Sequence, residues 1–263
     1  MLVDEGVWAH LARLQSKVSP VEYARRVLGF AADAKQAEVL GAGAKRLLLC
    51  CSRQWGKSTT AAALVTHRAV HEKGALVLCV APTLRQSAEL IRKVGQFLDV
   101  GQVEWKGGRQ GCVLKNGSRV LAVPGEEATV RGYSAPSLIV IDEAARVSDA
   151  LYKSIRPMLV VGQGDLVLLS TPFGERGFFW KEWAEGGKEW TRIEGKATEC
   201  ERISAEVLEE ERRVQTAEWF AQEYLCSFVG MENRAFRKEW LEAAEVEGLG
   251  VRPLEFELKG RVR

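Results

Sequence analysis

The sequence has no apolar run that approaches the length of a membrane-spanning helix, and no two of its cysteines form a CxxC pair. Asp4 and Glu5 interrupt the N-terminus, so we expect no secretory signal there. Histidine is also scarce, and His67 and His71 have no third residue in view that would complete a metal site. We expect the cysteines to be buried thiols in a reducing compartment: Cys50, Cys51, Cys79, Cys112, Cys200 and Cys226.

The overall charge does not identify a class of partner. The 263 residues carry a net charge of +2, and their 46% hydrophobic and 27% charged content is ordinary for a globular protein. A chain of this length can form one large α/β domain with a small appendage. Any binding of nucleic acid would therefore depend on local basic patches.

The stretch CSRQWGKSTT, residues 51–60, ends like a phosphate-binding P-loop in Gly56, Lys57 and Ser58. The P-loop pattern has an earlier glycine at the position that Cys51 occupies here. An apolar run at 45–51 predicts a buried strand before the loop, and helix formers follow the loop until Gly74. In this context Lys57 would reach the β- and γ-phosphates of a nucleotide, and Ser58 would bind Mg²⁺. The alternative is a chance GKS at the start of a helix.

The rest of the chain predicts an α/β fold. Apolar runs predict strands at 75–83, 137–147 and 165–174, helical spacing predicts a helix at 84–99, and Asn116-Gly117 predicts a hairpin within 112–123. Strands alternating with helices indicate a mainly parallel sheet flanked by helices. Together with the phosphate-loop motif, this makes a P-loop NTPase (ASCE/RecA-like) the expected fold. A charged helical pair after residue 200 predicts a small C-terminal helical lid subdomain. Ligands of such sheets bind beyond the carboxyl ends of the strands.

Two acidic residues end one of the predicted strands. Asp142 closes an apolar run, as in a Walker B strand, whose aspartate holds Mg²⁺. Glu143 follows, and on a strand its side chain would point to the opposite side from Asp142. This position suits a general base that polarises the attacking water. The alternative is that the two acids cap a helix that begins after the strand.

Together these motifs resemble the ATPase motor of phage large terminases. The likeness lies in CSRQWGKST, ATVRGYSAPSLIVIDEAARV, LLSTPFGERGFFW and FAQEYLCSFVGMENRAF, which follow one another in the family's order. The family commonly replaces the first P-loop glycine, so the resemblance implies a variant loop and not a broken one. It implies catalytic roles for Glu143, Arg131, Lys57 and Arg53. Arg131 would enter a neighbouring subunit's site as an arginine finger, and Arg53 would face the γ-phosphate.

The resemblance also implies a wider ATP site, with Mg²⁺ held by Ser58 and Asp142. Ser170 and Thr171 match the family's coupling motif, and their hydroxyls could hydrogen-bond the attacking water or Glu143. The residues expected to bind ATP within the loop are Ser52, Arg53, Gln54, Trp55, Gly56, Lys57, Ser58 and Thr59.

The adenine-reading segment departs from the family pattern. The family has an aromatic residue directly before its glutamine, whereas here Lys35 precedes Gln36. Gln36 is nevertheless expected to hydrogen-bond adenine, with Phe30 stacked on the base.

A basic segment is the candidate DNA surface. Residues 84–119 hold seven basic and three acidic residues, an excess larger than that of the whole chain. Basic side chains on one surface bind phosphates of any sequence, as a DNA motor requires. We expect Lys106 and Arg109, with Arg92 and Lys93, to contact double-stranded DNA in the channel of a ring. The alternative is an ordinary solvated face.

The expected organisation is an N-terminal helical segment at 1–30, an ATPase core at 31–200 and a lid with linker at 201–263. Asp165 is the last aspartate, so the clustered aspartates of the family's nuclease domain are missing and we expect no nuclease activity in this chain. The implied partners are double-stranded DNA, further copies of the chain in a ring, a portal protein and a small terminase subunit. We expect no membrane partner, and a location in the host cytoplasm, docked transiently on the procapsid.

The predicted function is therefore ATP hydrolysis that moves viral double-stranded DNA into a procapsid. A helicase-type translocase shares the loop and the acidic pair, but it would need a second motor domain after Thr171. A nucleotide-gated DNA-binding scaffold with little turnover is the other alternative, and Glu143 argues against it.

Overall fold

A computed structural model describes residues 19–126, 130 and 132–230. Its centre is an eight-stranded sheet in the order β3-β4-β5-β2-β6-β7-β1-β8. Strands β1, β2, β5, β6, β7 and β8 pair in parallel, while β3 and β4 are antiparallel additions at one edge. The strands are β1 Arg46–Cys51, β2 Leu76–Ala81, β3 Trp105–Gly108, β4 Gly111–Leu114, β5 Arg119–Pro124, β6 Leu138–Asp142, β7 Asp165–Ser170 and β8 Thr191–Gly195. The predicted mainly parallel α/β sheet is confirmed.

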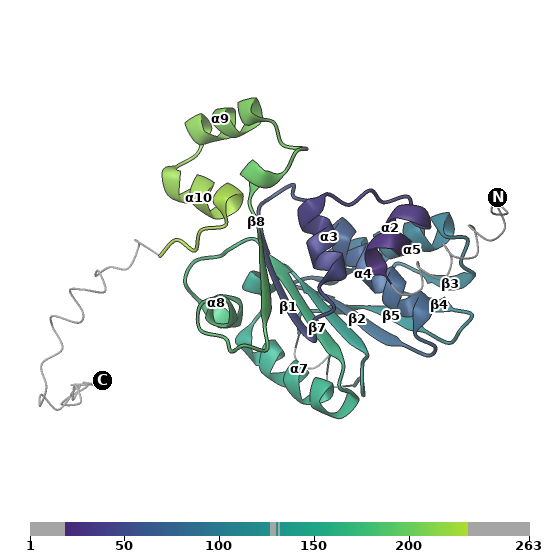
Figure 1. Ribbon diagram of the computed structural model, residues 1–263. Helices are drawn as coiled ribbons and strands as arrows, with labels where there is room; N and C mark the ends of the chain where they lie inside the picture. Colours follow the sequence, from purple (N-terminus) through teal and green to yellow (C-terminus); the bar gives the residue numbers. More distant parts are fainter. Residues whose placement is uncertain (1–18, 127–129, 131, 231–263) are drawn as a thin grey trace, which may run out of the picture. The chain divides into compact units, whose positions relative to one another are not determined.

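Helices cover both faces of this sheet (Figure 1). Alternate residues of β1 enter different cores: Leu47 and Leu49 join a cluster with α4 and α5, and Leu48 joins one with α7 and α8. This alternation is why the central strands are apolar throughout instead of alternating with polar residues. The helices are α2 Pro20–Arg26, α3 Ala34–Gly41, α4 Lys57–His71, α5 Leu84–Val100, α7 Asp149–Gly162, α8 Gly177–Ala184, α9 Ala205–Val214 and α10 Ala217–Leu225.

The predicted hairpin is the β4–β5 connection. Gly117 takes a φ of 86°, and the backbone N–H of Leu114 donates to the carbonyl of Ser118 at 2.9 Å. The Asn116 side chain accepts from the Ser118 N–H at 3.0 Å and donates to the carbonyl of Ala69 at 2.9 Å. The hairpin is thereby fastened to the C-terminal part of α4.

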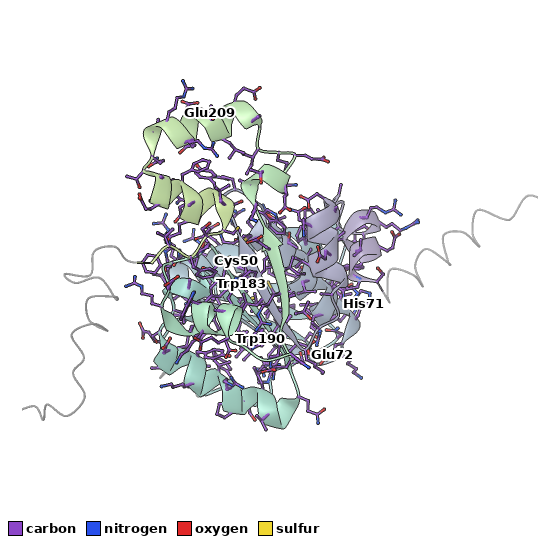
Figure 2. All side chains as sticks on the ribbon, turned by 60° about the vertical axis from the view of Figure 1, so that its left-hand side comes forward. Cys50, His71, Glu72, Trp183, Trp190 and Glu209 are labelled. Carbon is purple, nitrogen blue, oxygen red and sulfur yellow. The ribbon has the colours of Figure 1, made fainter. Side chains whose placement is uncertain are left out.

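Helices α9 and α10 form the predicted helical pair beyond β8. They pack around Phe220 and Tyr224, with Ile203 and Leu208 against them. Figure 2 shows Glu209 of α9 near the top of the view, well above Trp190, which directly precedes β8. Both helices belong to the same compact unit as the sheet, and this unit extends through Val229.

Two strands were not predicted. In β8 only Ile193 and Gly195 are buried, and β3 has no buried residue, so neither carries a strong apolar pattern. In the part of the chain that the structure describes, no helix is both long and apolar enough to cross a membrane.

Candidate active site

The phosphate loop joins β1 to α4. Residues 52–56 form the turn, in which Gln54 and Gly56 take left-handed φ values of 59° and 95°. Lys57 begins α4, and no described side chain caps the N-terminus of this helix. The first N–H groups of α4 can therefore bind an anion such as phosphate. The predicted strand, loop and helix are confirmed.

The P-loop pattern has a glycine where this chain has Cys51, but the neighbouring strand β8 places a glycine, Gly195, beside Cys51. Cys51 is the last residue of β1 and pairs with Gly195 of β8. A Cβ at Gly195 would lie 2.5 Å from Nε1 of Trp55, so the indole requires glycine there. Burial raises the pKa of Cys51, which keeps its thiol neutral inside the core. The loop is therefore a complete variant in which the side chain of Trp55, 1% exposed, anchors the turn.

Two side chains from distant elements hold the backbone of this loop. Gln36 Nε2 donates to the carbonyl of Trp55 at 3.2 Å, and Arg202 Nη2 donates to the same oxygen at 2.6 Å. Arg202 also pairs with Asp33 at 2.8 Å. A Cβ at Gly56 would lie 2.7 Å from Gln36 Nε2, so the glutamine is packed against the loop. No sequence pattern pointed to Arg202, because its partners are a backbone carbonyl and Asp33, which is 169 residues away in the sequence.

The two residues expected to read adenine are engaged within the protein. The Gln36 amide completes a capping box with Asp33 at the start of α3, in addition to its bond to the loop. Phe30 packs in a cluster with Tyr23 and Leu28, its ring 6.0 Å from that of Phe97. Their contact with adenine stays a prediction.

Lys57 and Glu143 form the central ion pair of the site. Lys57 Nζ lies 2.9 Å from Glu143 Oε1, with side chains 15% and 21% exposed. Burial alone would lower the pKa of Lys57, but the nearby carboxylates of Glu143 and Asp142 raise it overall. The lysine is thus a permanent cation, which an incoming phosphate would have to draw away from the glutamate.

Asp142 and Ser58 place two oxygens together beside this pair. Ser58 Oγ donates to Asp142 Oδ2 at 2.9 Å. Burial raises the pKa of Asp142, although Lys57 opposes the shift, so a nearby cation would favour the ionised carboxylate. A hydroxyl and a carboxylate suit Mg²⁺, which takes few protein ligands and completes its shell with water and phosphate. No cluster of three His, Cys, Asp or Glu residues that could hold a metal occurs among the described residues.

Glu143 does not extend the strand, contrary to the sequence-based expectation. Strand β6 ends at Asp142, and Glu143 takes a left-handed φ of 53° before the short 3₁₀ turn Ala144–Arg146. The Asp142 carboxylate accepts from the Glu143 N–H at 2.9 Å, a local bond that competes with strand geometry. The turn aims Glu143 at Lys57 instead of at the opposite face.

Arg146 is a site residue that the sequence analysis missed. Its Nη1 lies 3.2 Å from Glu143 Oε2 and 3.2 Å from Thr171 Oγ1. Of the predicted coupling residues, Thr171 therefore reaches Glu143 through Arg146. Ser170 and Ser52 are fully buried, and their hydroxyls have no hydrogen-bond partner among the described residues.

Arg53 lies at the outer side of the loop. Its Nε is 3.6 Å from Glu223 Oε2 of α10, and its side chain is 59% exposed. A role toward the γ-phosphate stays a prediction. Arg131 lies outside the described residues, so its role as an arginine finger also stays a prediction.

The basic segment divides into two groups. Lys106 on β3, Arg109 after it and Arg92 on α5 are exposed. Lys93 instead turns to the phosphate loop, where its Nζ donates to Thr59 Oγ1 at 2.8 Å. Burial lowers the pKa of Lys93, and Arg92 adds to the shift. This contact differs from the expected DNA surface and adds a cation beside the nucleotide site.

The chain is similar to a known protein family and to two curated phage proteins. The family described as "Terminase large subunit, T4likevirus-type, N-terminal" matches residues 48–243. The terminase large subunits of Thermus phage G20c and Thermus virus P23-45 are each 24% identical over 198 residues, which is 66% of this chain and 41% of theirs. The chain thus spans about two fifths of these relatives.

Solved structures share the fold. The large terminase ATPase domain of Thermus phage P74-26 has a TM-score of 0.71 at 21% identity, covering 80% of this chain and 99% of that one. The HK97 bacteriophage large terminase has a TM-score of 0.65 at 14% identity, covering 80% and 55%. The large terminase of a thermophilic bacteriophage, in complex with ADP, has a TM-score of 0.62 at 12% identity, covering 82% and 53%.

Proposed function

Since the chain belongs to the family of T4-type terminase large subunits, matching its N-terminal part, we propose that it is an ATPase that drives viral DNA into a procapsid. The observation that carries this proposal is the meeting of Lys57, Ser58, Asp142 and Glu143 at the carboxyl ends of β1 and β6. Cation, hydroxyl, buried carboxylate and a second carboxylate are the groups that phosphoryl transfer from ATP to water needs.

ATP binding begins at the N-terminus of α4. The free N–H groups and Lys57 take the phosphates, so the ammonium exchanges Glu143 for phosphate oxygen. Ser58 and Asp142 would hold Mg²⁺, which supplies charge neutralisation for the β- and γ-phosphates. The exchange frees the Glu143 carboxylate only when phosphate is present, so turnover is tied to correct binding.

Hydrolysis then uses Glu143 as the general base. The carboxylate accepts a proton from water as the water oxygen bonds to the γ-phosphorus. The bond from that phosphorus to the β–γ bridging oxygen breaks, and ADP leaves with the bonding electrons. Lys57 stabilises charge on the phosphate oxygens during this step.

Arg131 of an adjacent subunit and Arg53 supply further positive charge in this proposal. Both roles are supported by the resemblance of the surrounding sequence motifs to those of the family. Arg131 lies outside the described residues. The proposed partners are double-stranded DNA, further copies of the chain in a ring, a portal protein and a small terminase subunit. Exposed Lys106 and Arg109 are the proposed DNA contacts.

ATP turnover per protomer, measured across protein concentration, tests the proposal. We expect turnover that rises with concentration as subunits complete one another's sites. Glu143→Gln should abolish turnover yet keep ATP binding, while Glu104→Gln, which changes a carboxylate 76% exposed, should behave as wild type. ATP binding without turnover at every concentration would favour the scaffold alternative.

The DNA contact is tested separately by salt dependence. Lys106→Glu with Arg109→Glu should weaken binding to duplexes of any sequence, and each lost phosphate contact should reduce the salt slope by about 0.9. Lys181→Glu with Lys188→Glu is the matched charge control, because both lysines are exposed outside the basic segment. Equal slopes in both double variants would show that the DNA surface lies elsewhere.

A further inference from the structure

Arg146 connects three separate elements at the active site. It ends the 3₁₀ turn that follows β6, and its backbone N–H donates to the Glu143 carbonyl at 2.9 Å. Residues three apart in a 3₁₀ turn lie on the same side, which brings the Arg146 guanidinium to the Glu143 carboxylate. The spacing of these two residues is therefore set by the turn itself.

The guanidinium is divided between partners on different elements. Nη1 faces Glu143 and Thr171, at the end of β7, each at 3.2 Å. Nη2 lies 3.6 Å from Oε1 of Glu223 on α10. The planar fork of arginine can serve several oxygens at fixed angles, which a lysine ammonium cannot reproduce. A single side chain thus touches the proposed base, the proposed coupling motif and the lid.

Glu223 makes this contact consequential because its side chain is only 6% exposed. A buried carboxylate requires nearby positive charge, and Glu223 has Arg146 and Arg53 within 3.6 Å. Any displacement of Arg146 therefore changes the positive charge around Glu223, and with it the contacts that hold α10. The contact differs from simple packing, although Arg146 also lies over the Phe173 ring at 4.6 Å.

We propose that Arg146 is a positioning residue that holds Glu143 for catalysis and transmits the state of the site to α10 through Glu223. The proposal rests on the proposed ATPase function. When phosphate draws Lys57 away, Arg146 is the partner that keeps the Glu143 carboxylate oriented. Once Lys57 no longer pairs with Glu143, the Glu143 carboxylate interacts more strongly with Arg146. This changes the Arg146–Glu223 pair, and α10 responds.

Kinetics supply the first test. Arg146→Ala should lower kcat by about 10- to 100-fold, a range taken from loss of a charge-assisted hydrogen bond, with little change in the Kd for a fluorescent ATP analogue. Arg146→Lys should recover only part of kcat. Arg176→Ala is the matched control, because Arg176 lies over the same Phe173 ring at 4.3 Å, and it should keep wild-type kcat. Unchanged kcat in Arg146→Ala would overturn the positioning role.

Hydrogen exchange of residues 217–225 supplies a readout that needs no turnover. In the wild type, addition of a non-hydrolysable ATP analogue with Mg²⁺ should change exchange in α10, and Arg146→Ala should remove that response while the analogue still binds. Glu223→Gln should also remove it, and the double variant should lose no more kcat than Arg146→Ala alone. A full α10 response in Arg146→Ala, no response in the wild type, or multiplicative kcat losses would each refute the transmission. Failure of the ATPase proposal would instead appear as absent wild-type turnover.

Discussion

Trp55 offers a sharp test of how the phosphate loop is built. The sequence alone suggested a nucleotide contact for this residue, whereas its side chain is 1% exposed and packs in the core with Cys51 and Ile193. Trp55→Ala should therefore act on stability first. Removing a buried tryptophan side chain costs about 3–5 kcal/mol, which corresponds to a fall of roughly 6–20 °C in Tm for a unit of this size.

Urea unfolding without nucleotide is the appropriate assay, because it separates stability from ligand binding. Gly195→Ala tests the same contact from the opposite side, since its Cβ would lie 2.5 Å from Trp55 Nε1. Overpacking of this kind costs about 1–3 kcal/mol. Val160→Ala, at a side chain 75% exposed, should stay within about 0.5 kcal/mol of wild type. A loss below about 1 kcal/mol in Trp55→Ala, together with weakened ATP binding, would refute the anchor and restore the nucleotide contact.

Three other features of the structure can be tested by single substitutions. Burial raises the pKa of Cys79, so the thiol ionises at lower pH in the unfolded chain than in the folded one. The free energy of unfolding should therefore fall as pH rises above about 8.5, by up to about 1.4 kcal/mol per pH unit, and thermal melts of Cys79→Ala should show a shallower alkaline decline. Lys93→Ala should weaken ATP binding in a fluorescence titration more than Arg92→Ala does, and the reverse order would return Lys93 to the DNA surface. Arg202→Ala should raise KM for ATP by about 10-fold through loss of a charge-assisted bond to the loop carbonyl, while an unchanged KM would mean that the loop holds its shape without it.

The sequence predicted the sheet because its central strands are apolar throughout and end in polar site residues. It also predicted that the phosphate loop and Asp142 meet, since carboxyl ends of parallel strands share one edge. Strand β8 escaped prediction because only Ile193 and Gly195 face the core. Its role as the neighbour of Cys51 became visible only through pairing.

Lys93 shows why charge counts cannot locate a surface. It stands beside Arg92 in the sequence, yet the two differ by about 100° around an α-helix. Lys93 borders the buried face that contains Leu90 and Val94, whereas Arg92 faces outward and pairs with Glu89. Helix phase could have indicated the difference, but Thr59, 34 residues away, could be identified as the partner only from the packing of α5 on α4.

The strand that carries the phosphate loop comes early in the chain but gains its neighbours late. The Arg46 side chain on β1 donates a hydrogen bond to the carbonyl of Gly164, which lies just before β7 and 118 residues further on. The strand that pairs with the other side of β1 is β8, which comes later still. A ribosome adding about 5–20 residues per second needs roughly 6–24 s for that interval. During this time the apolar β1 segment has neither of its strand partners. ATP cannot stabilise the nascent chain in that period, because the site that would bind it is not yet assembled.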